Sequence, residues 1–246
     1  MSLSRRDFIG ASAAAVTGAA IAPGIRLTEL AQARPLDETA STANRWALLI
    51  DSNKCAKGCT TCVEACFIEN GINNENMKGS DATKPQWIRK VEVKDPNSGF
   101  ENSFPVMCQH CQKPPCVDVC PTGASFKRAD GIVLVDKHIC IGCRYCMMAC
   151  PYKARSFVHE DITDQKPYAP RGKGTVESCT LCVQKIDRGD GTTACAEACL
   201  KIGHRAILFG DLNDANSDIA KEVKSKATRR IREDLKLDNS VRYIGI

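Results

Sequence analysis

The chain has 246 residues, enough for one or two compact domains with a modest core. Aromatic residues make up only 5% of it, whereas it contains 16 cysteines, so we expect something besides apolar burial to stabilise the fold. The formal net charge is +5. Basic residues alternate with acidic ones and form no stripe, which argues against a nucleic-acid-binding protein.

The first 33 residues have the order of an export signal peptide. Arg5 and Arg6 come first, a weakly apolar, Ala-rich stretch follows over residues 11–22, and Leu30-Ala31-Gln32-Ala33 supplies a small-x-small cleavage site. The paired arginines resemble the twin-arginine export class. A membrane anchor is the alternative, but residues 8–22 number only 15, fewer than the ~20 that a membrane-spanning helix needs. We therefore expect cleavage after Ala33, delivery to the periplasm, and a mature chain that is soluble or held at the membrane by a partner.

The mature chain begins with a polar stretch over residues 34–45, which we expect to be a flexible leader. The apolar run over residues 46–50 predicts a short buried strand that leads into the first group of cysteines. That group is spaced x3, x2, x3 and consists of Cys55, Cys59, Cys62 and Cys66.

Two hairpins are predicted around the second group of cysteines. Apolar residues on either side of the turn at residues 95–99 indicate the first hairpin. The second has Asp130-Gly131 as its tight turn, between residues 125–128 and 132–135. The cysteine group between the hairpins is spaced x2, x4, x3, is followed by Pro121, and consists of Cys108, Cys111, Cys116 and Cys120.

The third group of cysteines matches the bacterial ferredoxin run C-x2-C-x2-C-x3-C-P without deviation. It consists of Cys140, Cys143, Cys146 and Cys150, followed by Pro151. Three cysteines in a tight loop can wrap one [4Fe–4S] cube, and Gly142 gives that loop the backbone freedom to curl. The x3 gap sets the third and fourth cysteines one helical turn, about 6 Å, apart, so the fourth sulfur reaches a second cluster. Such motifs must therefore come in pairs.

The last third of the chain is predicted to contain a surface loop, a strand, a helix and a short strand or tail. Residues 161–174 form the loop, residues 206–209 form the strand, and residues 241–244 end the chain as a short strand or tail. Between the last two segments, Asn216 or Ser217 can cap a final helix. Its expected apolar stripe consists of Ile219, Val223, Ala227, Ile231 and Leu235. The fourth group of cysteines, with twelve residues between its middle pair, consists of Cys179, Cys182, Cys195 and Cys199.

The cysteines thus form four complete groups with none left over. Zinc ribbons also use C-x2-C pairs but have no use for a C-x2-C-x2-C triple. Cysteines spaced at x2 rarely form a disulfide without strain. Four oxidised clusters would contribute a charge of about −8 and turn the formal sum to about −3, so the excess of Lys and Arg is compensation for buried anionic cofactors. His110 could replace a ligand, but because every group is complete we interpret it as a loop histidine near a cluster. We find no independent catalytic site.

Three stretches of the chain carry a resemblance to a known family. They are C-V-D-V-C-P-T-G-A at residues 116–124, C-I-G-C-R-Y-C-M-M-A-C-P-Y-K-A-R at 140–155, and the wide fourth motif with F-G-D-L-N-D at 209–214. Together they resemble the four-cluster iron–sulfur subunits that accompany polysulfide, nitrite, dimethyl sulfoxide and formate enzymes. Arg45-Trp46-Ala47 and the widened Cys55-x3-Cys59 spacing are similar to the DsrO type, from the Dsr membrane complex of sulfur metabolism. Leu200, where a Pro often follows the last cysteine, departs from the family pattern.

The resemblance implies an α+β fold of two pseudo-symmetric, ferredoxin-like halves within residues 46–246. Motifs one and four would build residues 46–100 plus 175–215, motifs two and three would build residues 101–174, and a C-terminal helix and tail would occupy residues 216–246. The implied ligand sets for four [4Fe–4S] clusters are Cys55/Cys59/Cys62/Cys199, Cys179/Cys182/Cys195/Cys66, Cys108/Cys111/Cys116/Cys150 and Cys140/Cys143/Cys146/Cys120.

The function that the resemblance implies is electron transfer within a membrane-associated respiratory or sulfur-metabolism complex, with no catalytic residues in this chain. The implied partners are an integral-membrane, quinone-interacting subunit of the NrfD, PsrC or DsrP type, and either a multihaem cytochrome or a molybdopterin subunit. A wire to a molybdopterin catalytic subunit is the alternative within this class. A zinc- or disulfide-stabilised exported binding module is the alternative from another class. The twin-arginine route, which exports folded proteins, would let the thiols acquire metal before they meet an oxidising compartment.

Overall fold

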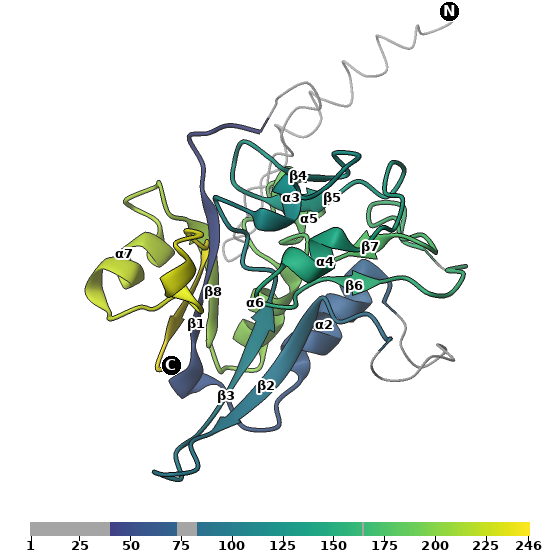
Figure 1. The fold of residues 1–246 in the computed structure, drawn as a ribbon. Helices are drawn as coiled ribbons and strands as arrows, with labels where there is room; N and C mark the ends of the chain where they lie inside the picture. The colour runs from purple at the N-terminus through teal and green to yellow at the C-terminus, as the bar shows by residue number, and fades with distance from the viewer. Residues whose placement is uncertain (1–39, 73–82, 164) are drawn as a thin grey trace, which may run out of the picture. The chain divides into compact units, whose positions relative to one another are not determined.

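A three-stranded sheet in the order β8-β1-β9 lies between the C-terminal helix and the other helices in the computed structural model, which describes residues 40–72, 83–163 and 165–246 (Figure 1). The predicted signal peptide lies outside these residues. Strand β1, Trp46–Asp51, pairs antiparallel with β8, Ile207–Asp211, and parallel with β9, Val241–Ile244. Strands β1 and β8 were expected from the sequence, and residues 241–244, expected as a short strand or tail, form a strand. Leu48 and Ile50 face the cluster of buried residues that holds most of the cysteines, while Ala47 and Leu49 pack against Ile219. The alternation of a strand thus buries both faces of β1.

Three antiparallel hairpins accompany the sheet. Strands β2, Ile88–Lys94, and β3, Glu101–Met107, form the long projecting hairpin of Figure 1. Strands β4, Ser125–Lys127, and β5, Val133–Val135, form the second predicted hairpin, with its turn over residues 128–131. The pair β6, Ser156–Phe157, and β7, Val176–Glu177, was not predicted, because two-residue strands leave no periodic signal.

Short helices follow the cysteine loops. They are α2, Thr61–Asn70; α3, Pro115–Asp118; α4, Tyr145–Ala149; α5, Val183–Asp187; and α6, Ala194–Lys201. Helix α2 of the first motif packs on α6 of the fourth, and α3 of the second packs on α4 of the third. The fold is a small mixed helix and sheet structure, as the α+β prediction requires.

The C-terminal helix is shorter than predicted. Ser217 caps helix α7, Asp218–Ser225, through a hydrogen bond from Ala220 N to its Oγ of 3.2 Å. The helix ends at Ser225, so the outer part of the expected apolar stripe does not lie on it. Arg229 instead exchanges two backbone hydrogen bonds of 2.8 Å with Tyr243 in β9. A short 3-10 turn, η2, follows at Glu233–Leu235. Backbone pairing with a distant strand has overridden the helical periodicity.

Two predicted loops are also more ordered than the sequence indicates. Within the expected leader, Arg45 N donates to Asp211 Oδ1 at 2.7 Å, and Asn44 Nδ2 donates to Oδ2 of the same carboxylate at 2.7 Å. Within the expected surface loop, Arg171 is buried and pairs with Glu177. Among the helices that the structure describes, none is long and apolar enough to cross a membrane.

Candidate iron–sulfur centres

Every cysteine motif places its third cysteine in the same position. Cys62, Cys116, Cys146 and Cys195 are each the second residue of their helix, in α2, α3, α4 and α6 respectively. In the first three motifs the loop before the helix carries the first two cysteines, whereas in the fourth Cys179 and Cys182 precede α5, which lies before α6 in the chain. In the third motif Gly142 has φ +70°, and a Cβ there would lie 2.1 Å from the carbonyl oxygen of Gly174, so only glycine permits this turn. All sixteen cysteines are free thiols, and no two of them form a disulfide.

One group of thiols combines the first and fourth motifs. Cys66 of α2 lines a cavity with Cys179, Cys182 and Cys195 of the fourth motif, among apolar side chains such as Leu48 and Met107. Burial raises the pKa of Cys66 well above its usual range, and the thiols of Cys179, Cys182 and Cys195 raise it further. Four soft sulfur donors therefore meet in an apolar shell, which suits an iron–sulfur cluster better than it suits free thiolates.

A second group combines the second and third motifs. Cys150, the last cysteine of the third motif, lines a cavity with Cys108, Cys111 and Cys116, beside Pro151 and Tyr152. Burial raises the pKa of Cys108 to about 12, despite the opposing charge of Arg155. The raised pKa favours the protonated thiol of Cys108. Metal binding would favour the thiolate instead, because a coordinating thiol is deprotonated outright.

The remaining cysteines lie nearer the surface. Cys55 and Cys59 are half-buried, and the pKa of Cys62 is raised to about 12 by burial and by the nearby thiols of Cys195, Cys55 and Cys199. On the side of the third motif, Cys143 is exposed, and Cys120 and Cys140 are half-buried. Cys146 is buried beside Cys116.

Backbone N–H groups point at several of the sulfurs. The described donors are Ser125 to Cys120 at 3.3 Å, Val176 to Cys140 at 3.4 Å, Leu181 to Cys179 at 3.4 Å, Ala194 to Cys182 at 3.5 Å, and Ala206 to Cys199 at 3.2 Å. Hydrogen bonds of this kind stabilise negative charge on sulfur and raise the reduction potential of a cluster. Ser125, Val176 and Ala206 lie outside the motif whose sulfur they contact, and Leu181 and Ala194 lie within the fourth motif; cysteine spacing alone reveals none of these donors.

Side chains that the cysteine spacing did not predict also reach the sulfurs. Arg155 is 5% exposed; it donates from Nη2 to Cys116 Sγ at 3.1 Å and from Nη1 to Ser125 Oγ at 2.7 Å. Lys90 donates from Nζ to Cys55 Sγ at 3.0 Å, and Asn70 donates from Nδ2 to Cys66 Sγ at 3.5 Å. Arg155 lies shortly after the third motif in the chain, so its place in the sequence indicated that it lies near a cluster. Lys90 is 35 residues from Cys55, and no local pattern in the sequence indicates their contact.

His110 is fully buried between the first two cysteines of its motif. Its Nδ1 accepts a hydrogen bond from Val133 N at 3.0 Å, which leaves the ring proton on Nε2. Burial and the charge of Arg155 lower its pKa to about 3. The ring therefore supports β5 as a neutral side chain, in agreement with its interpretation as a loop histidine.

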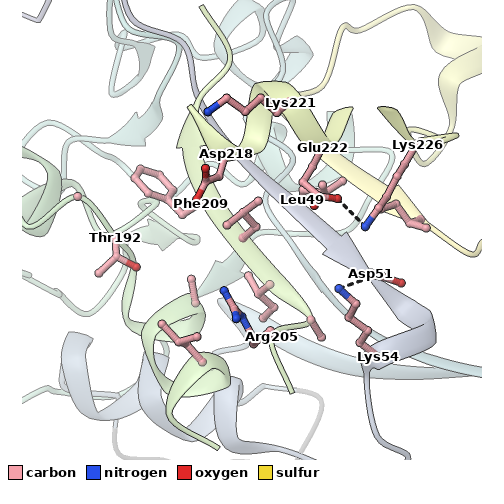
Figure 2. Close-up of a pocket in the computed structure, with 17 residues that line it drawn as sticks. Leu49, Asp51, Lys54, Thr192, Arg205, Phe209, Asp218, Lys221, Glu222 and Lys226 are labelled. Atoms are coloured by element: carbon pink, nitrogen blue, oxygen red, sulfur yellow. Dashed lines mark ion pairs between the residues drawn. The ribbon is translucent and has the colours of Figure 1, made fainter. Parts of the chain in front are cut away.

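A cavity of about 580 Å³ lies apart from the sulfurs (Figure 2). Strands β1 and β8 and helices α6 and α7 contribute to its walls, and no cysteine lines it. Lys54 pairs with Asp51 at 3.6 Å, and Lys226 pairs with Glu222. Four of the charged side chains that line it are thus paired, and it offers no chemistry comparable with that of the cysteine groups.

Comparison with known proteins agrees with this geometry. The 4Fe-4S dicluster domain family matches residues 100–211. The first iron–sulfur subunit of the Hdr-like menaquinol oxidoreductase of Archaeoglobus fulgidus is 38% identical, over 98% of this chain and 97% of that protein. A subunit of the tetrathionate reductase of Salmonella typhimurium is 36% identical over 89% of this chain and 78% of its own length. The NrfC homolog of Haemophilus influenzae is 33% identical over 94% of this chain and 90% of its own length.

Proposed function

The chain belongs to the family of iron–sulfur electron-transfer subunits of membrane oxidoreductase complexes, and we propose on this premise that it holds four [4Fe–4S] clusters in two ferredoxin-like halves. The observation that carries the proposal is the mixing of motifs: Cys66 lines a cavity with the fourth motif, and Cys150 lines one with the second. The proposed ligand sets are Cys55/Cys59/Cys62/Cys199, Cys179/Cys182/Cys195/Cys66, Cys108/Cys111/Cys116/Cys150 and Cys140/Cys143/Cys146/Cys120.

Neighbouring thiols suggest the order of the four sites. Cys62 interacts with Cys195, Cys179 interacts with Cys108, and Cys116 interacts with Cys146. These three electrostatic interactions arrange the four ligand sets in a row that begins at the Cys55 set and ends at the Cys140 set. The outer two sites contain the half-buried and exposed cysteines, and the inner two contain only buried ones. Electrons would therefore enter and leave at the outer sites, while the protein shields the inner ones from water.

The protein's own contribution is to position the clusters and compensate their charge. Each oxidised cluster with four thiolates carries about −2. Backbone N–H groups, Arg155 and Lys90 donate to the sulfurs and offset this charge within an apolar surrounding. No residue in this arrangement needs to bind a substrate, because the bound clusters supply the redox chemistry.

Iron analysis tests the number of clusters. Anaerobically prepared protein should contain about sixteen iron and sixteen acid-labile sulfide per chain, four of each per cubane. A reproducible value near twelve would contradict the fourth site and implicate the widened first motif. Zinc in place of iron would contradict the proposed function altogether.

We further propose that the chain is exported by the twin-arginine route and works in the periplasm, attached to its complex through an integral-membrane, quinone-interacting subunit. The Archaeoglobus relative is a subunit of a menaquinol oxidoreductase, which favours a quinone-linked partner over a molybdopterin subunit. A role of the DsrO type in sulfur metabolism would also fit this arrangement. Replacing Arg5 and Arg6 together by Lys should leave the protein in the cytoplasm, because a receptor reads this pair. Normal periplasmic delivery of the variant would refute the route.

A further inference from the structure

Lys90 of the β2–β3 hairpin reaches across to the first cysteine loop. Its half-buried Nζ donates to Cys55 Sγ at 3.0 Å, to the carbonyl oxygen of Ala56 at 2.9 Å, and to that of Cys59 at 3.2 Å. An ammonium group has three protons, so these contacts use its full donor capacity. The side chain thus binds one sulfur and two backbone carbonyls of the same loop.

The first loop needs such a contact more than the other loops do. It has three residues between its first two cysteines, where the second, third and fourth motifs have two. Two carbonyl oxygens of this longer loop, those of Ala56 and Cys59, accept hydrogen bonds from Lys90. Lys90 itself is held in register, because it lies opposite Pro105 in the ladder between β2 and β3.

Two other lysines near the loop pair with a carboxylate and not with a sulfur. Lys57, within the loop, pairs with Glu101 at 2.7 Å, and Lys94 pairs with the same carboxylate at 3.0 Å. Neither contact involves a sulfur. Among the residues that the structure describes, Lys90 is therefore the cation that donates a hydrogen bond to Cys55 Sγ.

We propose that Lys90 is a positioning residue for Cys55, which holds the widened loop closed and raises the reduction potential of the cluster at Cys55, Cys59, Cys62 and Cys199. The proposal rests on the proposed function, since it requires a cluster at these residues. Reduction adds one electron to that cluster, and a neighbouring positive charge favours the more negative, reduced state. Partial burial strengthens the effect, because the surrounding water screens the charge less.

The test compares three variants of the full-length, cluster-loaded protein by iron content and by redox titration monitored by electron paramagnetic resonance. Lys90→Met removes the charge and the donors while keeping the stem length. Lys90→Arg keeps the charge. Lys57→Met is the matched control, because it removes one positive charge from the same loop without touching a sulfur.

We expect Lys90→Met to make reduction of one cluster about tenfold less favourable, which is about 59 mV for a one-electron couple. Lys90→Arg should shift it less, and Lys57→Met should leave all potentials close to those of the unaltered protein. If Lys90→Met instead loses the cluster, so that iron falls from about sixteen to about twelve, retention of sixteen in Lys90→Arg and Lys57→Met would support the positioning role.

Two results would overturn the assignment of Lys90. One is a fully loaded Lys90→Met protein with unchanged potentials. The other is equal loss of iron in Lys90→Met and Lys57→Met. Failure of the proposed function gives a different result, because the unaltered protein would then lack this cluster before any substitution is made.

Discussion

The two pairs of motifs differ in the length of the helix that carries the third cysteine of each motif. Helix α2 has ten residues and α6 has eight, and each contains the fourth cysteine of its motif, Cys66 or Cys199. Helices α3 and α4 have only four and five residues and end before Cys120 and Cys150. The predicted single helical turn between the third and fourth cysteines therefore holds in the first and fourth motifs but not in the other two.

Proline accounts for the difference. Pro121 and Pro151 directly follow the fourth cysteines of the second and third motifs, and a residue before proline avoids the helical region. Cys150 accordingly has an extended backbone with ψ 112°. Phe67 and Leu200 stand at the equivalent places in the other motifs and let the helix continue. The departure of Leu200 from the family pattern thus has a structural consequence: α6 continues to Lys201.

The pairs also differ in how a cation reaches the sulfurs. Arg155 is buried and comes from the chain directly after the third motif, whereas Lys90 is half-buried and comes from a separate hairpin. Arginine remains charged in an apolar surrounding more readily than lysine does. We therefore expect the site at Cys108, Cys111, Cys116 and Cys150 to depend on a fixed cation, and the site at Cys55 to be more easily perturbed.

The largest expected effect tests the crossing of motifs. Cys150→Ser should damage the cluster at Cys108, Cys111 and Cys116, and leave four thiolates at Cys140, Cys143, Cys146 and Cys120. Serine is a harder ligand than a thiolate, so one iron should be lost or the potential shifted. Cys66→Ser should likewise disturb the fourth-motif cluster. Spectroscopic titration of each cluster would show this, and the crossed arrangement is wrong if each variant perturbs only the cluster of its own motif.

The next effect concerns the contact that ties the two pairs together. Arg171 donates to both carboxylate oxygens of Glu177, at 2.9 and 3.0 Å, and to the carbonyl oxygen of Gly71 at the end of α2. Both side chains are buried, so Glu177→Gln should leave the guanidinium without a counter-charge and lower the free energy of unfolding by about 3–5 kcal/mol. Denaturant titration measures it.

Glu101→Gln is the matched control, since Glu101 pairs with two lysines at the surface. It should change the free energy of unfolding by no more than about 1 kcal/mol. Equal losses in the two variants would mean that burial does not distinguish these ion pairs.

A smaller effect should follow from making the fourth motif resemble the third. Leu200→Pro removes a backbone donor and the helical conformation at Cys199, so we expect a loss of about 3 kcal/mol or less near the end of α6. Leu200→Ala, which keeps the helix, should have little effect because Leu200 is 54% exposed. Thermal unfolding and the spectrum of the Cys199 cluster would check both. A Pro variant as stable as the Ala variant would show that helix length is not what separates the pairs of motifs.

The smallest expected effect concerns Arg155. Arg155→Lys keeps the charge, but an ammonium group cannot donate to Ser125 Oγ and Cys116 Sγ with the fixed geometry of a guanidinium. We expect a loss of about 1–2 kcal/mol in unfolding free energy, with the Cys116 cluster still present. Loss of that cluster in the Lys variant would mean that the bidentate geometry, and not the charge, holds the site.

The sequence by itself determined the motifs, the strands β1 and β8, two hairpins and a final helix that begins after Asn216 or Ser217, because cysteine spacing, apolar runs and turn residues are local signals. The tertiary structure decided the rest. It ended α7 at Ser225, since Arg229 pairs with Tyr243, and it ordered Asn44 and Arg45 against Asp211. It also brought Lys90 to Cys55 and Arg171 to Glu177. Neither hydrophobic periodicity nor turn residues indicate which residues make these contacts, because each contact depends on how separate segments pack in the folded chain.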